Sequence, residues 1–338
     1  MDLSTLSRTA QAMVALGKGV LAIDESHSTC KKRFDELGVE CTEETRREYR
    51  ELLITAPGIE DAVSGMILFD ETLRQSTKDG KRFVDVLKSK GILPGIKVDT
   101  GAKDLALHSG EFVTEGLDGL RERLVEYREL GAQFAKWRAV IVISDSFPSE
   151  ACVQANAHAL ARYAALCQEA GLVPMVEPEI LMDGGHSIER CYAVTARVLD
   201  ALFAELKEQG VALPGAILKV SMVIHGKKAP FQATPQQVAE MTVKCLKEKV
   251  PAEIPGVVFL SGGQSAFDST IHLDLMNKLG GMPWPLSFSY GRGIQQPALE
   301  HWAMHRNDMG TAQKILVHRA KMNGAASMGK YEESLDVL

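Results

Sequence analysis

Eight short apolar runs recur along the chain, and longer segments with the 3.6-residue apolar period of a helix separate them. Each run is mostly apolar on both faces, which is typical of parallel strands buried on both sides. The pattern therefore predicts a strand in each run and a helix between successive strands. The predicted strands are residues 20–24, 65–70, 94–98, 135–142, 173–179, 216–220, 257–261 and 286–290.

Residues at the ends of the helical segments support this alternation. Ser149, for example, precedes an alanine-rich run that stops at Gly171. Eight alternating units predict an α/β fold, a closed (β/α)8 or TIM barrel, and an open doubly wound sheet is the alternative. No linker or charge block interrupts the sequence, so we expect one domain over residues 1–338, with an added helix at 1–19 and a tail at 324–338.

Composition and charge narrow the range of partners. The net charge of -6 and the pI near 5.9 argue against nucleic acid or an anionic membrane as the main partner. The six cysteines are scattered without a CxxC pair, so we expect free thiols in a reducing compartment. No signal sequence or membrane-spanning run is visible, so we expect a cytoplasmic protein, or a plastid protein if a transit peptide has been removed.

Charged side chains stand at the ends of most predicted strands. In a barrel these ends form one rim, where barrel enzymes keep their active sites. Because side chains alternate along a strand, Lys136 and Arg138 share one face, as do Glu177 and Glu179. Each could be a salt-bridged core residue, but burying so many ions gives little stability, so we interpret them as functional. The charged rim residues are Asp24, Lys97, Lys136, Arg138, Glu177, Glu179, Lys219 and Arg292.

The lysines at this rim suggest Schiff-base chemistry. An amine attacks a carbonyl only when it is neutral, and neighbouring cations together with partial burial lower the pKa of a lysine. Lys219 is the candidate nucleophile, with Lys136 as the neighbouring cation. The resulting iminium would withdraw electrons from the adjacent carbon–carbon bond. A buried carboxylic acid, Glu177 or Glu179, would move protons through the carbinolamine step.

Two glycine-containing sequences, SGGQS at 261–265 and SYGRG at 289–293, follow the last two predicted strands. The loops after strands seven and eight are the usual phosphate site of this fold, and backbone amides with an arginine bind phosphate well. Glycine-rich turns are mostly only turns, but two on neighbouring strands favour function. The candidates are Ser261, Gly262, Gly263, Ser289, Gly291 and Arg292.

The histidines give little support for a metal enzyme. The nine histidines show no HExxH or other ligand spacing, so we expect neither a metal nor a cofactor. His301 and His305 are four apart on a predicted helix, where an ordinary helix face is the favoured interpretation. His186 follows the fifth predicted strand and could reach the rim, although a loop histidine is usually only solvated.

Eight sequence blocks at these positions resemble the class I fructose-bisphosphate aldolases. They occur in the order of that family and extend from about residue 10 to 331, which makes the resemblance specific. The blocks are GKGVLAIDES (17–26), GMILFDETL (65–73), GIKVDTG (95–101), QFAKWR (133–138), VPMVEPEIL (173–181), GAILKVSMV (215–223), FLSGGQS (259–265) and FSYGRGIQ (288–295).

The resemblance implies reversible cleavage of fructose 1,6-bisphosphate to dihydroxyacetone phosphate and glyceraldehyde 3-phosphate by a homotetramer, in glycolysis, gluconeogenesis or carbon fixation. It implies that Lys219 forms the Schiff base, beside the cation of Lys136. Glu177 would be the acid/base of the carbinolamine step, with Glu179 supporting it. Asp24 would take the proton of the C4 hydroxyl as the C3–C4 bond breaks.

The resemblance also implies two phosphate sites. The C1 phosphate would lie against Ser261, Gly262, Gly291 and Arg292, and the C6 phosphate would face Ser26, Lys97 and Arg138. Further rim positions implied by the match are Thr29, Lys32 and Arg33.

The chain departs from the family pattern at two places. Val220 and Ser221 follow Lys219, where the family block reads Leu-Lys-Pro-Asn-Met. Many members also end in a tyrosine that assists protonation of the enamine, whereas here the nearest tyrosine to the final Leu-Asp-Val-Leu is Tyr331. The sequence leaves open a preference for fructose 1-phosphate or sedoheptulose 1,7-bisphosphate. It also leaves open a transaldolase-like enzyme and a catalytically silent scaffold that binds sugar phosphates.

Overall fold

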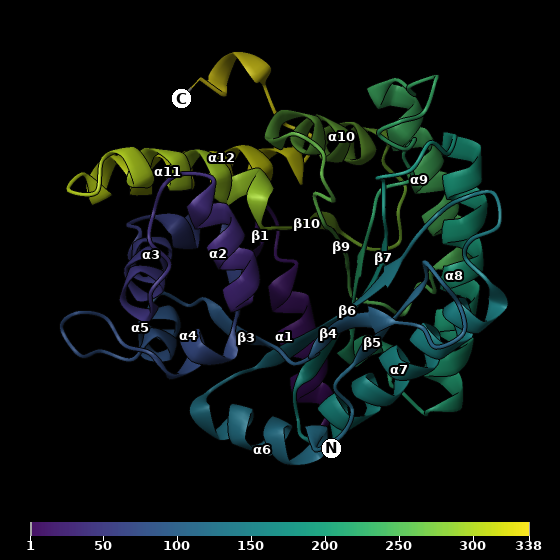
Figure 1. Ribbon diagram of the computed structural model, residues 1–338, viewed down its shortest axis with the longest axis horizontal. Coiled ribbons are helices and arrows are strands. Elements are labelled where there is room, and N and C mark those ends of the chain that lie inside the picture. Colours follow the sequence, from purple (N-terminus) through teal and green to yellow (C-terminus); the bar gives the residue numbers. More distant parts are fainter. Residues whose placement is uncertain (1, 338) are drawn as a thin grey trace.

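The protein, described by a computed structural model over residues 2–337, is built on a closed barrel of eight parallel strands (Figure 1). The strands follow the order β1-β10-β9-β8-β7-β6-β3-β2 around the barrel, so the predicted (β/α)8 barrel is confirmed. The predicted strands agree with the observed ones to within about two residues at either end. The barrel strands are β1 Gly19–Ile23, β2 Val63–Leu68, β3 Leu93–Lys97, β6 Phe134–Ile141, β7 Val173–Ile180, β8 Ile217–Val220, β9 Val257–Phe259 and β10 Leu286–Tyr290.

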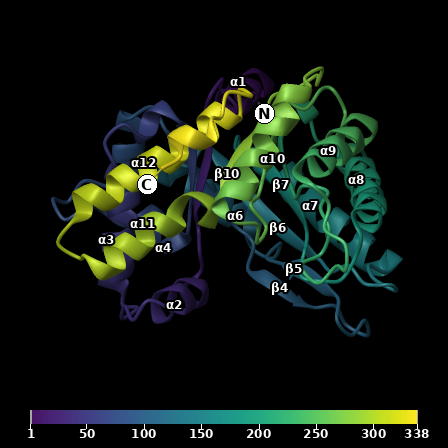
Figure 2. The ribbon, with the colours of Figure 1, turned by 90° about the horizontal axis from the view of Figure 1, so that it is seen from above.

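Helices surround the barrel and bury its outer face. In Figures 1 and 2, α2, α3, α11 and α12 lie on one side of the barrel, and α7, α8 and α9 lie on the other. The helices are α1 Leu3–Met13, α2 His27–Asp35, α3 Glu43–Thr55, α4 Asp70–Arg74, α5 Phe83–Ser89, α6 Leu120–Leu130, α7 Glu150–Glu169, α8 Ile188–Glu208, α9 Pro235–Lys249, α10 Ala266–Leu279, α11 Arg292–Met304 and α12 Met309–Ala326. Within residues 2–337, none of these helices is long and apolar enough to cross a membrane.

Side-chain alternation along the strands separates two apolar clusters. On β6, Ala135, Trp137 and Ile141 join the large cluster between the strands and the surrounding helices. Phe134, at the start of β6, instead joins the small cluster inside the barrel. The next inward positions of the same strand are Lys136 and Arg138, so one strand carries apolar residues at its start and charged residues toward its end.

Helix α1 closes the amino-terminal end of the barrel. It is shorter than the helix predicted at 1–19, and its N-cap is Asp2, whose side chain accepts hydrogen bonds from the backbone N–H groups of Ser4 and Thr5. Its buried residues Leu6 and Met13 belong to the small cluster inside the barrel. The floor of the barrel is therefore apolar, and polar groups are left for the opposite end.

Two features differ from the prediction. A short antiparallel hairpin, β4 Gly101–Asp104 and β5 Phe112–Glu115, follows β3, and its mixed polar sequence gave no strand signal. The tail predicted at 324–338 also contains regular structure, because α12 continues to Ala326 and a 3-10 turn forms at Glu333–Leu335. We call residues 327–337 the C-terminal segment.

Candidate active site

A cavity of about 1150 Å³ opens at the carboxyl ends of the strands. Residues at or just after the ends of all eight barrel strands line it, and we call it the mouth cavity. Every site residue predicted from the sequence lies in its lining. These residues are Asp24, Ser26, Thr29, Lys32, Arg33, Lys97, Lys136, Arg138, Glu177, Glu179, Lys219, Ser261, Gly262, Gly263, Ser289, Gly291 and Arg292.

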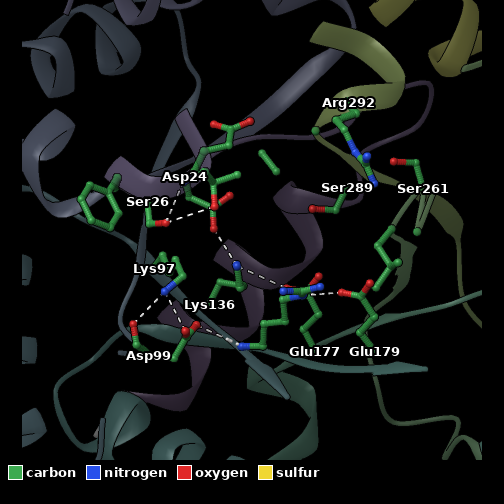
Figure 3. A pocket seen from close by; sticks show the side chains of 18 of the residues that line it. Asp24, Ser26, Lys97, Asp99, Lys136, Glu177, Glu179, Ser261, Ser289 and Arg292 are labelled. Carbon is green, nitrogen blue, oxygen red and sulfur yellow. Dashed lines mark hydrogen bonds and ion pairs between the residues drawn. The ribbon is translucent and has the colours of Figure 1, made fainter. Parts of the chain in front are cut away.

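Two lysines and two carboxylates form a connected group at the floor of the cavity. Lys219 Nζ lies 3.0 Å from Glu177 Oε1. Lys136 Nζ lies 2.6 Å from Asp24 Oδ2 and 3.4 Å from Glu177 Oε2 (Figure 3). The side chains of Lys136, Glu177 and Lys219 are at most 5% exposed, so these charges interact in a largely water-excluded environment.

The strand registers explain why these side chains meet. Along the parallel β6–β7 pair, Arg138 stands opposite Glu177, and along the β3–β6 pair Lys97 stands opposite Lys136. The side chains of Lys136 and Glu177 continue the inward rows that Phe134 and Val173 begin. The predicted sharing of one face within each Lys-x-Arg and Glu-x-Glu pair is therefore confirmed.

Burial and pairing act in opposite directions on Lys136 and Asp24. Burial alone would lower the pKa of Lys136, but the nearby Asp24, Glu177 and Asp99 carboxylates raise it above its ordinary value. Burial would raise the pKa of Asp24, but Lys136 and Lys219 lower it below its ordinary value. Lys136 is therefore a permanent cation at neutral pH, and Asp24 is a carboxylate.

The two glycine-containing loops lie together on one side of the cavity. Figure 3 shows Arg292 near Ser261 and Ser289, away from Lys97 and Asp99. Gly262 and Gly263 have φ angles of +52° and +89°, a backbone conformation that glycine adopts without strain. Two helices also begin here, since α10 starts at Ala266 and α11 starts at Arg292. Helix N-termini favour anions, so this side of the cavity suits a phosphate.

The other side of the cavity carries cations that are already paired. Lys97 Nζ lies 2.6 Å from Asp99 Oδ1. Arg138 forms an ion pair with Glu179. Ser26 instead caps α2, where its side chain accepts a hydrogen bond from the backbone N–H of Thr29.

Arg33 is less available than the sequence suggested. Its guanidinium lies 2.6 Å from Glu25 Oε1 and 3.3 Å from Gln295 Oε1, and the residue is only 8% exposed. Glu25 also pairs with Arg50 at 2.8 Å. These contacts make Arg33 mainly part of a buried ion network behind the cavity wall, although the residue still lines the cavity.

Sequence reasoning missed Asp99 and Glu25, which also line the cavity. Asp99 binds Lys97 and accepts a hydrogen bond from the backbone N–H of Arg138 at 3.2 Å. Both acids stand within two positions of a predicted site residue, in KVDTG and IDES. Those positions were the available signal, but the contacts of Asp99 with β6 and of Glu25 with Arg50 on α3 depend on segments far apart in the sequence.

Histidines and cysteines contribute little to the cavity. His186 is buried outside the cavity lining, and His301 Nε2 lies 3.3 Å from Asp308 on the surface. All six cysteines are unpaired, as predicted. Within the described chain, no group of three or more His, Cys, Asp or Glu side chains is arranged to hold a metal ion.

The two departures from the family pattern have visible structural settings. Ser221 Oγ accepts a hydrogen bond from the backbone N–H of Ile180 at 2.9 Å and donates one to the Ile180 carbonyl at 3.0 Å. It thereby joins the end of β8, which carries Lys219, to the end of β7. Tyr331 is buried outside the mouth cavity, where its hydroxyl donates to Asp336 at 3.0 Å.

Fold and cavity together define a (β/α)8-barrel enzyme whose site is built on buried lysines and carboxylates. A family model described as "Fructose-bisphosphate aldolase class-I" matches residues 5–337. The chain belongs to the class I fructose-bisphosphate aldolase family.

Individual relatives match along nearly the whole chain. A protein of Xanthomonas campestris named probable fructose-bisphosphate aldolase class 1 is 60% identical over 98% of this chain and 100% of that protein. The cytosolic fructose-bisphosphate aldolase 4 of Arabidopsis thaliana is 51% identical over 94% of this chain and 81% of that protein. A solved structure of the Plasmodium falciparum aldolase, in complex with TRAP and an inhibitor, has a TM-score of 0.96 at 46% identity and covers 98% of this chain and 96% of that chain.

Proposed function

We propose that this enzyme reversibly cleaves fructose 1,6-bisphosphate to dihydroxyacetone phosphate and glyceraldehyde 3-phosphate through a Schiff base on Lys219. The observation that supports this most directly is the 3.0 Å contact between Lys219 Nζ and Glu177 Oε1 at the floor of the mouth cavity. A lysine nucleophile needs a neighbouring group that can exchange protons with it, and Glu177 is within reach. Lys136 holds Glu177 from the other side.

The proposed reaction begins when the neutral amine of Lys219 attacks the C2 carbonyl of the substrate. Glu177 then protonates the carbinolamine oxygen, which leaves as water and gives the iminium. The Asp24 carboxylate accepts the proton of the C4 hydroxyl, and the electron pair of the C3–C4 bond moves into the iminium. Glyceraldehyde 3-phosphate leaves, the remaining enamine is protonated at C3, and water releases dihydroxyacetone phosphate from Lys219.

The cations of Lys136 and Arg292 have different roles in this proposed reaction. Lys136 would keep Asp24 ionised and ready to accept a proton. The distance of 2.6 Å between Lys136 Nζ and Asp24 Oδ2 supports this role. Arg292, with the amides of the loops at 261–265 and 289–293, would hold the C1 phosphate. Lys97 and Arg138, with Ser26, Thr29 and Lys32 near them, would receive the C6 phosphate on the opposite side.

Borohydride trapping tests the mechanism. The protein is incubated with dihydroxyacetone phosphate and EDTA, reduced with borohydride, and its peptides are analysed by mass spectrometry. We expect a substrate-dependent adduct on Lys219 and none in a Lys219→Met variant, with Lys227→Met as a matched control that keeps the adduct. An adduct on another lysine would show that the nucleophile is not Lys219. Bound ligand without any adduct would support the silent sugar-phosphate-binding scaffold instead.

Substrate choice, assembly and location complete the proposed function. We propose fructose 1,6-bisphosphate as the preferred substrate, a homotetrameric assembly and a cytoplasmic location, and the cytosolic Arabidopsis relative supports the last of these. Comparing kcat/KM for fructose 1,6-bisphosphate, fructose 1-phosphate and sedoheptulose 1,7-bisphosphate ranks the substrates. Light scattering coupled to size-exclusion chromatography measures the assembly, and a monomeric mass would contradict it.

A further inference from the structure

The first turns of α10 contact both loops of the proposed C1-phosphate site, the one at 261–265 and the one at 289–293. The loop at 261–265, which we call the phosphate loop, runs directly into α10. His272 Nδ1 on α10 lies 2.7 Å from Oε1 of Gln264 in the loop. The hydroxyl of Tyr290, which precedes Gly291, donates to the Ser269 carbonyl at 2.8 Å. A displacement of α10 would therefore move the amides of the phosphate loop and disturb the neighbouring strand end.

A buried arginine on α12 holds this part of α10. Arg319 Nη2 donates to the carbonyl of Ala266, the first residue of α10, at 2.8 Å, and to Thr270 Oγ1 at the same distance. Its guanidinium also lies 5.0 Å from the centre of the Phe267 ring. The Arg319 side chain is 0% exposed, so its charge requires a counterion within the protein.

That counterion comes from the C-terminal segment. Asp336 accepts a hydrogen bond from Arg319 Nη1, and its side chain is also 0% exposed. The same carboxylate accepts from the Tyr331 hydroxyl at 3.0 Å and lies 3.1 Å from His318 Nε2. Tyr331 in turn donates its backbone N–H to Asp274 on α10 at 2.9 Å. The C-terminal segment is thus fastened to both α10 and α12.

We infer that Arg319 and Asp336 are positioning residues for the C1 phosphate. Through them the C-terminal segment, which lies outside the cavity, would hold the phosphate loop in the conformation that binds this phosphate. This inference rests on the proposed function, because it assigns the phosphate loop to the C1 phosphate. Neither residue lines the mouth cavity, so neither contacts the substrate. They act through Ala266, since an unpaired buried cation at Arg319 would shift and release the first turn of α10.

The condensation direction of the reaction separates the two phosphate sites. Dihydroxyacetone phosphate carries the phosphate assigned to the phosphate loop, and glyceraldehyde 3-phosphate carries the phosphate assigned to the opposite side. We expect Asp336→Asn to raise the KM for dihydroxyacetone phosphate by about fivefold or more, and the KM for glyceraldehyde 3-phosphate to change by less than about twofold. A general loss of folded protein would lower the maximal rate and leave both KM values unchanged.

Two further variants control this experiment. Glu333→Gln removes a charge from the exposed surface of the same segment and should leave both KM values unchanged. The double variant Arg319→Met with Asp336→Leu removes the ion pair without leaving a buried charge, so it should unfold closer to the wild-type temperature than Asp336→Asn does. It should nevertheless keep the raised KM for dihydroxyacetone phosphate, because no donor reaches Ala266.

The outcomes also distinguish this inference from the proposed function. If the wild-type enzyme does not condense the two triose phosphates, the proposed function fails before any variant is compared. If the wild-type enzyme is active but both KM values are the same in Asp336→Asn, only the positioning role is overturned. Equal increases in both KM values would also overturn it, since the effect would then not belong to the phosphate loop.

Discussion

Lys136 shows how a single residue can be buried and still charged. Its ammonium group is in contact with Asp24 and Glu177, which together offset the cost of removing it from water. The sequence predicted Lys136 as the cation beside the nucleophile Lys219, and the raised pKa of Lys136, caused by the neighbouring carboxylates against the effect of burial, agrees with that prediction. The sequence placed these lysines and acids at one rim but did not show that Asp24 and Glu177 are the acids in contact with Lys136.

Replacing Lys136 with methionine should move the acid limb of the pH–rate profile. In the wild-type enzyme Lys136 lowers the pKa of Asp24, so Asp24 stays ionised to a pH below the ordinary titration range of an aspartate. In Lys136→Met the burial of Asp24 is no longer offset by Lys136, so its pKa rises and activity is lost at a higher pH than in the wild-type enzyme. We also expect kcat to fall by about 100-fold or more.

The measurement is kcat/KM for fructose 1,6-bisphosphate between about pH 4 and 9. Lys88→Met, which removes an exposed lysine on α5, is the control and should retain the wild-type profile. An unchanged acid limb in Lys136→Met would show that Asp24 is not the group whose ionisation limits the rate.

Arg292 should matter for substrate binding more than for folding. Arg292→Ala removes the only arginine predicted for the C1-phosphate site, and a charged hydrogen bond to phosphate contributes about 1.5–3 kcal/mol. We expect kcat/KM for fructose 1,6-bisphosphate to fall by about 10- to 100-fold, with little change in the unfolding temperature. Arg162→Ala, on the exposed face of α7, should leave steady-state kinetics unchanged. A normal kcat/KM in Arg292→Ala would remove Arg292 from the phosphate site.

At the scale of elements, β6 and β7 each carry apolar inward residues at the start of the strand and charged inward residues toward its end. The starts of β6 and β7 carry Phe134 and Val173, which pack with α1 at the floor of the barrel. The later inward positions of the same strands carry Lys136 and Glu177. The apolar floor supplies the rigidity that holds the charged group in place, because interior packing leaves little room for movement.

Helix α1 should therefore contribute strongly to stability. Leu6 is 2% exposed inside the barrel floor, whereas Leu16, just beyond the helix, is 85% exposed. We expect Leu6→Ala to lower the free energy of unfolding by about 2–5 kcal/mol. Leu16→Ala should change it by no more than about 0.5 kcal/mol. Urea unfolding followed by circular dichroism measures both, and equal values would mean that α1 does not pack as the structure describes.

At the scale of the whole molecule, residues at or just after the ends of all eight barrel strands line the mouth cavity. A ligand bound there contacts many elements at once, so binding should stabilise the barrel as a unit. Fructose 1,6-bisphosphate at about 100 times its Kd should stabilise the folded state by about 2.7 kcal/mol. Thermal unfolding with and without the ligand tests this.

The proposed mechanism also predicts the effect of removing metal ions. Because the iminium on Lys219 accepts the electron pair of the C3–C4 bond, and Glu177 and Asp24 carry the proton transfers, EDTA should change neither the activity nor the ligand-induced rise in unfolding temperature. Loss of activity on chelation, restored by a divalent cation, would contradict a Schiff-base mechanism that needs no metal ion.

Predictions from the sequence succeeded where they rested on local patterns. The eight strands were visible as apolar runs, and the rim residues were visible because charges end those runs. The β4–β5 hairpin was missed because its strands are short and largely polar, so no periodicity marks them. The ion network of Glu25 with Arg33 and Arg50 was missed because its members lie on different elements.

The sequence by itself determined the barrel, its charged rim and the family, because strand and helix periods are local and parallel strands must end at one rim. Only the tertiary structure decided which acid pairs with which base. It placed Glu177 between Lys136 and Lys219, and it joined Asp336 to Arg319 behind the phosphate loop. Such pairings depend on the register and packing of segments far apart in the chain, which a one-dimensional pattern does not contain.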